Sequence, residues 1–296
     1  MNFGRIITAM VTPFGENGDI DFSQVKNLVD YLLSNGTEAI VVNGTTGESP
    51  TLTDSEKMTL IESVVQHVAG RVPVIAGTGS NNTRASIEMT VEAEKLGVDA
   101  VMLVAPYYNK PSQEGMFLHF QEIANATTLP VMLYNIPGRT GVNIEPETII
   151  RLSKIDNIVA VKDATGNLDD MATIIRETDE AFSVYSGDDQ LTLPVLAIGG
   201  AGVVSVSSHL YGNEMSEMVE AHYSGSYQRA SEIHRWLVPK MNTLFMAPNP
   251  VPVKTALNYL GIEVGMVRLP LIPLNEQEKV QLFHELNLNI NNIKVG

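Results

Sequence analysis

The chain has 296 residues, of which 44% are hydrophobic and 18% are charged, a composition that indicates a globular protein with a large buried core. Its net charge of −15 and its scattered 19 basic residues exclude a nucleic-acid partner, and the lack of cysteine excludes disulfides, thiolate metal sites and thiol nucleophiles. Because no apolar run reaches the roughly 18 residues that cross a bilayer and the N-terminus lacks a signal-peptide pattern, we expect a cytoplasmic protein without membrane partners.

Short apolar segments typical of strands recur along the whole sequence. There are eight of them: Ile6 to Met10, Ala39 to Val42, Val72 to Ala76, Ala100 to Val104, Val131 to Tyr134, Ile158 to Val161, Phe182 to Tyr185 and Val203 to Val206. Between most of them lie amphipathic stretches of helical period, such as Ser23 to Leu33, Asp54 to Val68 and Thr83 to Leu96. Strands and helices therefore alternate.

Several of these strands are apolar on both faces, which is typical of buried parallel strands. Eight β-α repeats favour closure into a (β/α)₈ TIM barrel, and the right-handed crossover rule leaves few other topologies. The alternative is an open doubly wound sheet, which normally carries a glycine-rich fingerprint after its first strand. Here that strand is followed by Thr12, Pro13 and Phe14, so we predict the barrel.

The strand pattern ends near Tyr211 and gives way to a C-terminal helical extension. Helical periodicity runs through Met215 to Trp236, Pro252 to Leu260 and Glu276 to Leu286, with proline and glycine clusters between these segments. We therefore divide the chain into a catalytic barrel, residues 1–224, and a C-terminal helical region, residues 225–296.

Lys162 is the candidate nucleophile among the lysines of the chain. It directly follows the apolar residues Ile158 to Val161, whereas most other lysines fall on amphipathic helices, in loops or near the C-terminus. Burial disfavours the charged ammonium form, so an amine at this position can attack a ketone. The alternative is a buried lysine paired with a carboxylate such as Asp163 or Asp188, and for an isolated strand lysine we would favour it.

Polar residues at neighbouring strand ends favour the catalytic interpretation, because the reactive residues of such barrels lie there. Tyr134 can pass protons, the turn from Gly44 to Gly47 offers backbone N–H groups and two hydroxyls for a carboxylate, and Arg139 can clamp a second carboxylate. Each alone has an ordinary alternative: a packed tyrosine, a simple turn or a surface ion pair. Together they predict an aldolase-type lyase that forms a Schiff base with a 2-oxo acid.

Other chemistries find less support in the sequence. The histidines show no metal-ligand spacing, so we expect no metal and no cofactor. There is no Gly-x-Ser-x-Gly elbow. The glycine-rich run from Gly199 to Gly202 precedes a strand and does not open a helix, which favours a turn over a phosphate site.

The chain resembles the dihydrodipicolinate synthase family of the pyruvate-dependent aldolase superfamily, which also contains N-acetylneuraminate lyase. The resemblance spans nearly the whole chain and rests on Thr12 to Phe14, Gly44 to Ser49, Pro106 to Pro111, Tyr134 to Gly141, Val161 to Asn167, Ser186 to Asp189 and Asn249 to Lys254. It implies a lyase that condenses pyruvate with L-aspartate 4-semialdehyde in lysine and diaminopimelate biosynthesis. The alternatives are an aldolase for a 2-keto-3-deoxy sugar acid or N-acetylneuraminate, and a non-catalytic sensor of 2-oxo acids.

The resemblance also implies the catalytic residues. Lys162 would form the Schiff base with pyruvate, and Tyr134 would relay protons to and from the intermediates. Thr45 would link Tyr134 to Tyr108, which a neighbouring subunit would contribute. The resemblance therefore implies self-association as a homodimer or homotetramer.

The substrate-binding residues are implied in the same way. Thr46 would hold the pyruvate carboxylate together with Thr45, and Arg139 would hold the carboxylate of the aldehyde. The Gly-Arg-Thr-Gly sequence that contains Arg139 resembles the synthase branch of the superfamily. Main-chain carbonyls near Gly187 and Val204 would line the pyruvate pocket.

One departure from the family concerns feedback control. Members inhibited by lysine tend to carry histidine and acidic residues where this chain has Asp54, Lys57 and Ala85. We therefore expect no strong inhibition by lysine. Other positions of that site are kept: Ser49, Asn81 and Tyr107.

Overall fold

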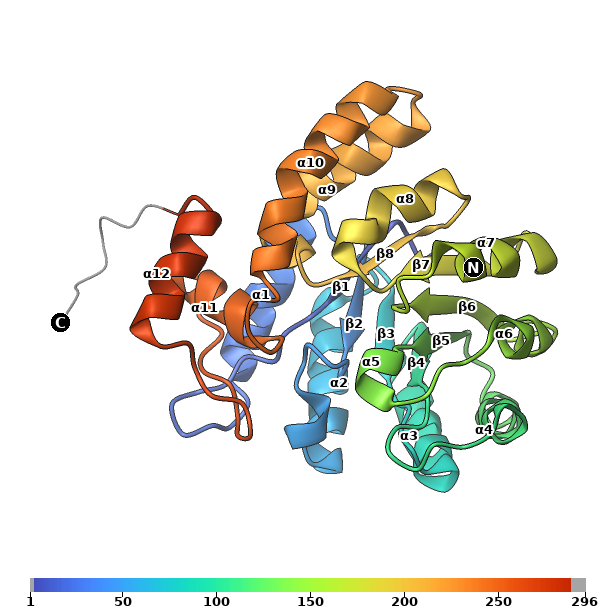
Figure 1. The fold of residues 1–296 in the computed structure, drawn as a ribbon. Coiled ribbons are helices and arrows are strands. Elements are labelled where there is room, and N and C mark those ends of the chain that lie inside the picture. The colour runs from blue at the N-terminus through green and yellow to red at the C-terminus, as the bar shows by residue number, and fades with distance from the viewer. Residues whose placement is uncertain (1–2, 289–296) are drawn as a thin grey trace.

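A computed structural model describes residues 3–288 and shows a closed barrel of parallel strands surrounded by helices (Figure 1). The strands follow one another in chain order around the barrel: β1 (Ile6–Ala9), β2 (Ala39–Val42), β3 (Val74–Gly77), β4 (Ala100–Val104), β5 (Val131–Asn135), β6 (Ile158–Asp163), β7 (Ser183–Ser186) and β8 (Gly202–Ser205). The barrel closes where β1 pairs with β8, with Ile7 opposite Val204. The predicted (β/α)₈ barrel is thus confirmed, and the open sheet is excluded.

Helices follow the strands on the outside of the barrel. They are α1 (Phe22–Ser34), α2 (Asp54–Val68), α3 (Thr83–Lys95), α4 (Gln113–Asn125), α5 (Pro137–Thr140), α6 (Pro146–Leu152), α7 (Leu168–Glu177) and α8 (Thr192–Ala197), with 3₁₀ turns η1 (Ser49–Thr51) and η2 (Asp189–Leu191). Polar side chains fix several helix starts by accepting hydrogen bonds from free N–H groups. Thr53 and Glu56 form a reciprocal capping box at α2, and Asn82 caps α3.

Side chains alternate between the barrel interior and the layer beneath the helices. On β6, Ala160 faces the interior while Val161 packs against the helices, and the register shift opposite Val131 and Met132 interrupts this alternation before Ala160. Lys162, two residues after Ala160, therefore points inward. Phe3 and Tyr185 belong to the same inner cluster, and the Tyr185 hydroxyl donates to the Gly4 carbonyl at the amino-terminal end of the barrel. Side chains therefore fill the barrel interior at its amino-terminal end. The candidate catalytic residues lie at the carboxyl-terminal end.

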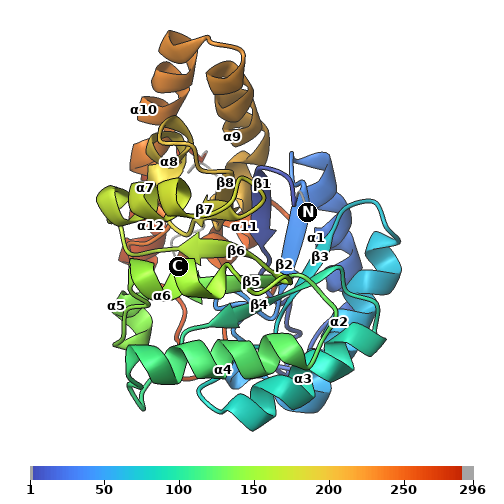
Figure 2. The same cartoon turned by 90° about the vertical axis from the view of Figure 1, so that its right-hand side faces the viewer.

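Within the described residues four helices follow β8: α9 (Ser208–Tyr223), α10 (Tyr227–Thr243), α11 (Val251–Tyr259) and α12 (Glu276–Glu285). The continuous helical stretch predicted from Met215 to Trp236 is wrong in this respect, because Gly225 adopts a φ of +80° and separates α9 from α10. These two helices lie side by side and project beyond the barrel (Figures 1 and 2). Within the described residues no helix is long and apolar enough to cross a membrane.

Candidate active site

Lys162 and Tyr134 are neighbours in the barrel wall. They are register partners on β6 and β5, and the Lys162 Nζ lies 4.1 Å from the centroid of the Tyr134 ring. Lys162 is 6% exposed and Tyr134 is 4% exposed. Strand register therefore brings together the amine and the phenol that the sequence predicted as partners.

The Lys162 amine makes no hydrogen bond or ion pair with any residue in the range 3–288. The two carboxylates considered as partners are engaged elsewhere. Asp163 Oδ1 accepts hydrogen bonds from the Thr165 backbone N–H and hydroxyl, and Asp188 accepts from Gln190. The predicted alternative of a structural ion pair is therefore wrong. The Lys162 amine is therefore available to a ligand.

The Gly44–Ser49 turn follows β2 and carries Thr45 and Thr46. Its Gly47 and Glu48 N–H groups donate to the Gly44 and Thr45 carbonyls within the turn. The Gly47 N–H is therefore unavailable to a ligand, and the predicted cradle of backbone N–H groups from Gly44 to Gly47 is wrong at this one position. Thr45 lines the cavity described below, whereas Thr46 is buried, and its Oγ1 accepts a hydrogen bond of 3.0 Å from Asn249 Nδ2.

A cavity of about 330 Å³ opens at the carboxyl ends of β2 to β5. Its lining includes Thr45, Tyr134 and Arg139, together with Tyr107 and Lys57. The exposed Arg139 side chain forms no ion pair within the described chain, so its guanidinium is available to a ligand. The cavity therefore joins a hydroxyl, a phenol and an unpaired cation.

Arg139 and Ile136 also line a second cavity, of about 260 Å³, on the other side of the Arg139 side chain. Gly187 lines this cavity too. So do Met241 and Asn242 on α10 and Phe245 just after the end of α10. Sequence reasoning missed this contribution, because helical periodicity does not show where a distant helix will pack.

Gly187 and Val204 occupy constrained positions near the amine. A Cβ atom on Gly187 would lie 2.7 Å from the Ala164 Cβ, so the backbone passes closer than a side chain permits. Val204 is 1% exposed and belongs to the inner cluster that contains Tyr134. Gly187 thus lies beside the residues that end β6, and the predicted role of both residues in the pyruvate pocket stays a prediction.

Tyr108 does not reach the site of its own chain. Its side chain is 89% exposed, its φ is +72°, and neither cavity includes it. A large aromatic residue held so far out of the fold is typical of a contact with another molecule. Its predicted link with Thr45 stays a prediction.

Two further lysines are buried, Lys240 and Lys254, and sequence reasoning singled out neither. Lys254 on α11 is 2% exposed and forms an ion pair of 3.1 Å with Glu48, which is equally buried. Burial lowers the pKa of Lys254, and the Glu48 carboxylate opposes that shift. The available signal was that Glu48 and Lys254 both lie in motifs of the predicted family.

The described histidines and carboxylates include no group of three or more that could hold a metal ion. His209, the histidine nearest a strand end, is fully buried with both ring nitrogens bonded to backbone groups. Both ring nitrogens of His209 are thus used by hydrogen bonds within the fold, and neither is available to a ligand.

Comparisons with known proteins agree on one family. The model of the dihydrodipicolinate synthetase family matches residues 2–288. The 4-hydroxy-tetrahydrodipicolinate synthase 1 of Halalkalibacterium halodurans is 60% identical over 98% of this chain and 99% of its own. The crystal structure of a dihydrodipicolinate synthase from Bacillus anthracis has a TM-score of 0.96 at 60% identity, covering 97% of this chain and 98% of that one. A Cyanidioschyzon merolae relative solved with lysine bound has a TM-score of 0.94 at 48% identity, covering 97% and 99%.

Proposed function

Because the chain belongs to the dihydrodipicolinate synthetase family, we infer that it condenses pyruvate with L-aspartate 4-semialdehyde to 4-hydroxy-tetrahydrodipicolinate. This is the activity of a Schiff-base lyase and belongs to lysine and diaminopimelate biosynthesis. The observation that supports it best is the buried Lys162 amine, which lacks a protein partner and faces the Tyr134 phenol. No observation favours a sugar-acid aldolase.

In the proposed reaction the Lys162 amine attacks the ketone carbon of pyruvate and expels water, which gives an imine. Loss of a C3 proton gives an enamine, which attacks the aldehyde carbon of the second substrate. Tyr134 is the proposed proton relay, since its ring lies beside the amine. Cyclisation through the amino group of the second substrate then releases the product and regenerates the free lysine.

The proposed carboxylate contacts follow from the available polar groups. Thr45 and Thr46 would bind the pyruvate carboxylate, and Gly187 and Val204 would shape the pocket around the methyl group. Arg139 would hold the carboxylate of the aldehyde, because its side chain lines both cavities and has no partner in the described chain.

Self-association is part of the proposal, because Tyr108 is 89% exposed in a single chain. As the fourth catalytic residue, Tyr108 of the partner subunit would complete the proton relay through Thr45. A homodimer suffices for this contact, and a homotetramer would contain it twice over.

We also propose that lysine does not inhibit the enzyme strongly. Lys57 lines a cavity together with Ser49, Asp54 and Ala85, and its Nζ lies 3.2 Å from Asp54 Oδ1. An ammonium group in this cavity repels a second cation, and it already uses the carboxylate nearest to it.

Reductive trapping tests the proposed function directly. Treatment with pyruvate and borohydride should add one reduced pyruvyl group to the chain, and peptide mass spectrometry should locate it at Lys162. The Lys162→Ala variant should show no adduct at any position. An unmodified wild-type chain, or an adduct on another lysine, would refute the proposal.

A further inference from the structure

The segment from Asn249 to Lys254 has no role in the reaction proposed above, although it lies directly behind the Gly44–Ser49 turn. Asn249 reaches Thr46, and Lys254 reaches Glu48, so one short segment contacts the turn at two points. Asn249 is 8% exposed and the other three side chains are 2% exposed. Polar contacts buried to this degree are strongly directional.

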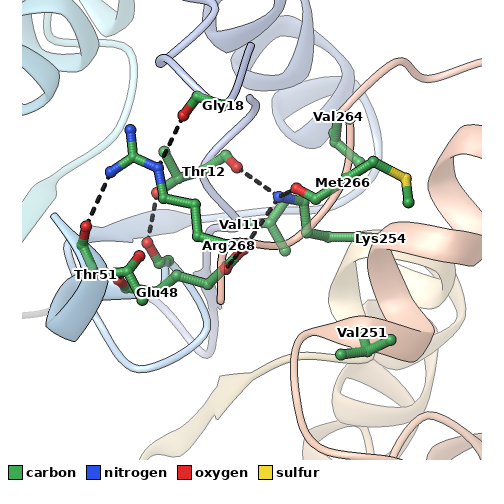
Figure 3. A network of polar contacts seen from close by, with 12 residues as sticks. Val11, Thr12, Gly18, Glu48, Thr51, Val251, Lys254, Val264, Met266 and Arg268 are labelled. Carbon is green, nitrogen blue, oxygen red and sulfur yellow. Dashed lines mark hydrogen bonds and ion pairs between the residues drawn. The ribbon is translucent and has the colours of Figure 1, made fainter. Parts of the chain in front are cut away.

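Lys254 uses all of its hydrogen-bonding capacity at this position. Its Nζ donates to the Thr12 carbonyl at 2.9 Å, to Glu48 Oε1 at 3.1 Å and to the Met266 carbonyl at 2.6 Å (Figure 3). An ammonium group has three N–H donors, so none remains free. These three hydrogen bonds hold the Lys254 side chain in one position, whereas Lys162 has no such partner among the described residues.

Glu48 transmits this position to the turn. Its φ is +55°, a left-handed conformation that costs a residue with a side chain energy unless its surroundings hold it. Glu48 Oε2 accepts from the Arg268 backbone N–H at 2.9 Å, and Oε1 accepts from Lys254. Its own N–H donates to the Thr45 carbonyl at 3.0 Å. The C-terminal segments therefore determine where Thr45 lies.

The Asn249 amide orients the hydroxyl group of Thr46. Its Nδ2 donates to Thr46 Oγ1, which fills one lone pair of that hydroxyl. No acceptor among the described residues receives the Thr46 hydroxyl proton. Because the Thr46 hydroxyl accepts from the Asn249 amide, its own proton points away from that amide. In this direction the hydroxyl can donate to a carboxylate ligand.

We propose that Asn249 and Lys254 are positioning residues for the pyruvate carboxylate. Lys254 fixes the Thr45–Thr46 turn through Glu48, and Asn249 orients the Thr46 hydroxyl as a donor. This inference rests on the proposed function, because it requires that Thr45 and Thr46 bind the carboxylate of pyruvate.

Two substitutions of Asn249 separate orientation from simple packing. Asn249→Ala removes the amide donor and should raise the KM for pyruvate about tenfold. Asn249→Asp keeps the shape but takes the Thr46 proton for its own carboxylate and adds a repulsive charge, so it should raise this KM about a hundredfold. The KM for the aldehyde should change less than about twofold in both. A purely structural role predicts the opposite order, with the alanine variant the more impaired.

The Lys254→Met variant tests the other contact. It should raise the KM for pyruvate at least about tenfold while kcat at saturating pyruvate falls by less than about threefold, because the chemical groups remain. Asn157→Ala is the matched control: Asn157 Nδ2 donates to three backbone carbonyls just before β6, at the amino-terminal end of the barrel. The control should lower thermal stability and leave both KM values unchanged.

Borohydride trapping of the same variants distinguishes the two hypotheses. At saturating pyruvate each variant should still form the Lys162 adduct. The pyruvate concentration that gives half of the maximal adduct should rise by the same factor as the KM for pyruvate. If the wild-type chain forms the adduct but neither Asn249 variant shifts the pyruvate dependence, the positioning role is wrong and the proposed function stands. If the wild-type chain forms no adduct, the proposed function fails first, and this inference fails with it.

Discussion

Lys162 and Lys254 are both buried, but their hydrogen-bonding surroundings differ. Lys254 has three acceptors, including a carboxylate, whereas Lys162 has none within the described residues. A buried charge is tolerated where hydrogen bonds and an opposite charge compensate its desolvation. The Lys162 amine lacks such partners among the described residues, which leaves it available to a substrate carbonyl.

At the same scale, Arg139 should determine affinity for the aldehyde and not for pyruvate. Arg139 lines both cavities and forms no ion pair with any described residue, so the substrate carboxylate should be its partner. Arg139→Ala should lower kcat/KM for L-aspartate 4-semialdehyde about a hundredfold, because a bidentate charged contact is lost. Steady-state kinetics with each substrate varied in turn measure the effect.

Arg139→Lys should recover only part of this loss, since a lysine cannot form the two parallel hydrogen bonds of a guanidinium. Arg84→Ala, an exposed arginine on α3, is the matched control and should behave like the wild type. An equal rise in the KM for pyruvate in the Arg139 variants would contradict the proposed division of the site.

Sequence could predict the site residues that lie on strands or directly after them, such as Lys162, Tyr134 and Thr45. Position on a parallel barrel strand determines both the end and the face on which a side chain appears. Lys254 and Asn249 could not be predicted, because their contacts join segments about 200 residues apart in the chain. Only the packing of α11 against the Gly44–Ser49 turn brings them together.

Among the elements, α9 is joined to the barrel by a neutral histidine. His209 Nε2 accepts from the Val11 N–H at 3.1 Å, and the Nδ1 side donates to the Val206 carbonyl at 2.8 Å. This arrangement requires one protonated and one free ring nitrogen. Full burial lowers the pKa of His209 to about 4, because the interior disfavours the charged imidazolium.

The stability of the barrel should therefore fall in acid. Since the pKa of His209 in the fold is below its unfolded value of about 6.5, the stabilisation is complete above pH 6.5 and is lost as pH falls towards 4. The difference in pKa corresponds to a contribution of about 3 kcal/mol to the free energy of unfolding. Denaturant unfolding between pH 7 and pH 4 measures it.

The His209→Gln variant isolates this contribution from that of other groups. A glutamine oxygen can still accept from Val11 but does not titrate, so the stability difference between wild type and variant should shrink from pH 7 to pH 4. His119, whose pKa is also lowered to about 4 by burial, is present in both proteins and cancels. A constant difference across this range would contradict the assignment.

The strands and most helices were predictable because each obeys a local pattern. α2 begins and ends at the predicted residues, since Thr53 and Glu56 form a capping box visible in the sequence. The boundary between α9 and α10 was missed because an amphipathic pattern continues through Gly225. Only the positive φ of that glycine ends the first helix.

For the molecule as a whole, the C-terminal region supports the barrel chemistry from two sides. α11 and the segment around Arg268 hold the Thr45–Thr46 turn, while α10 forms one wall of the cavity beside Arg139. The division at residue 224 stays a prediction, and we propose that the regions on its two sides depend on each other for activity. In the proposed reaction, the one catalytic group that a chain does not supply to its own site is the phenol of Tyr108.

Complementation between two inactive variants tests whether a second chain supplies that phenol. In a dimer of one Lys162→Ala chain and one Tyr108→Phe chain, the site with an intact Lys162 faces the partner subunit's Tyr108, so this site should be complete. Co-expression with two different affinity tags isolates this mixed dimer, which should show about half of the wild-type kcat. Homodimers of Lys162→Ala should be inactive, and those of Tyr108→Phe strongly impaired. If Tyr108 acted within its own chain, the mixed dimer would contain no complete site and would be no more active than half the Tyr108→Phe homodimer.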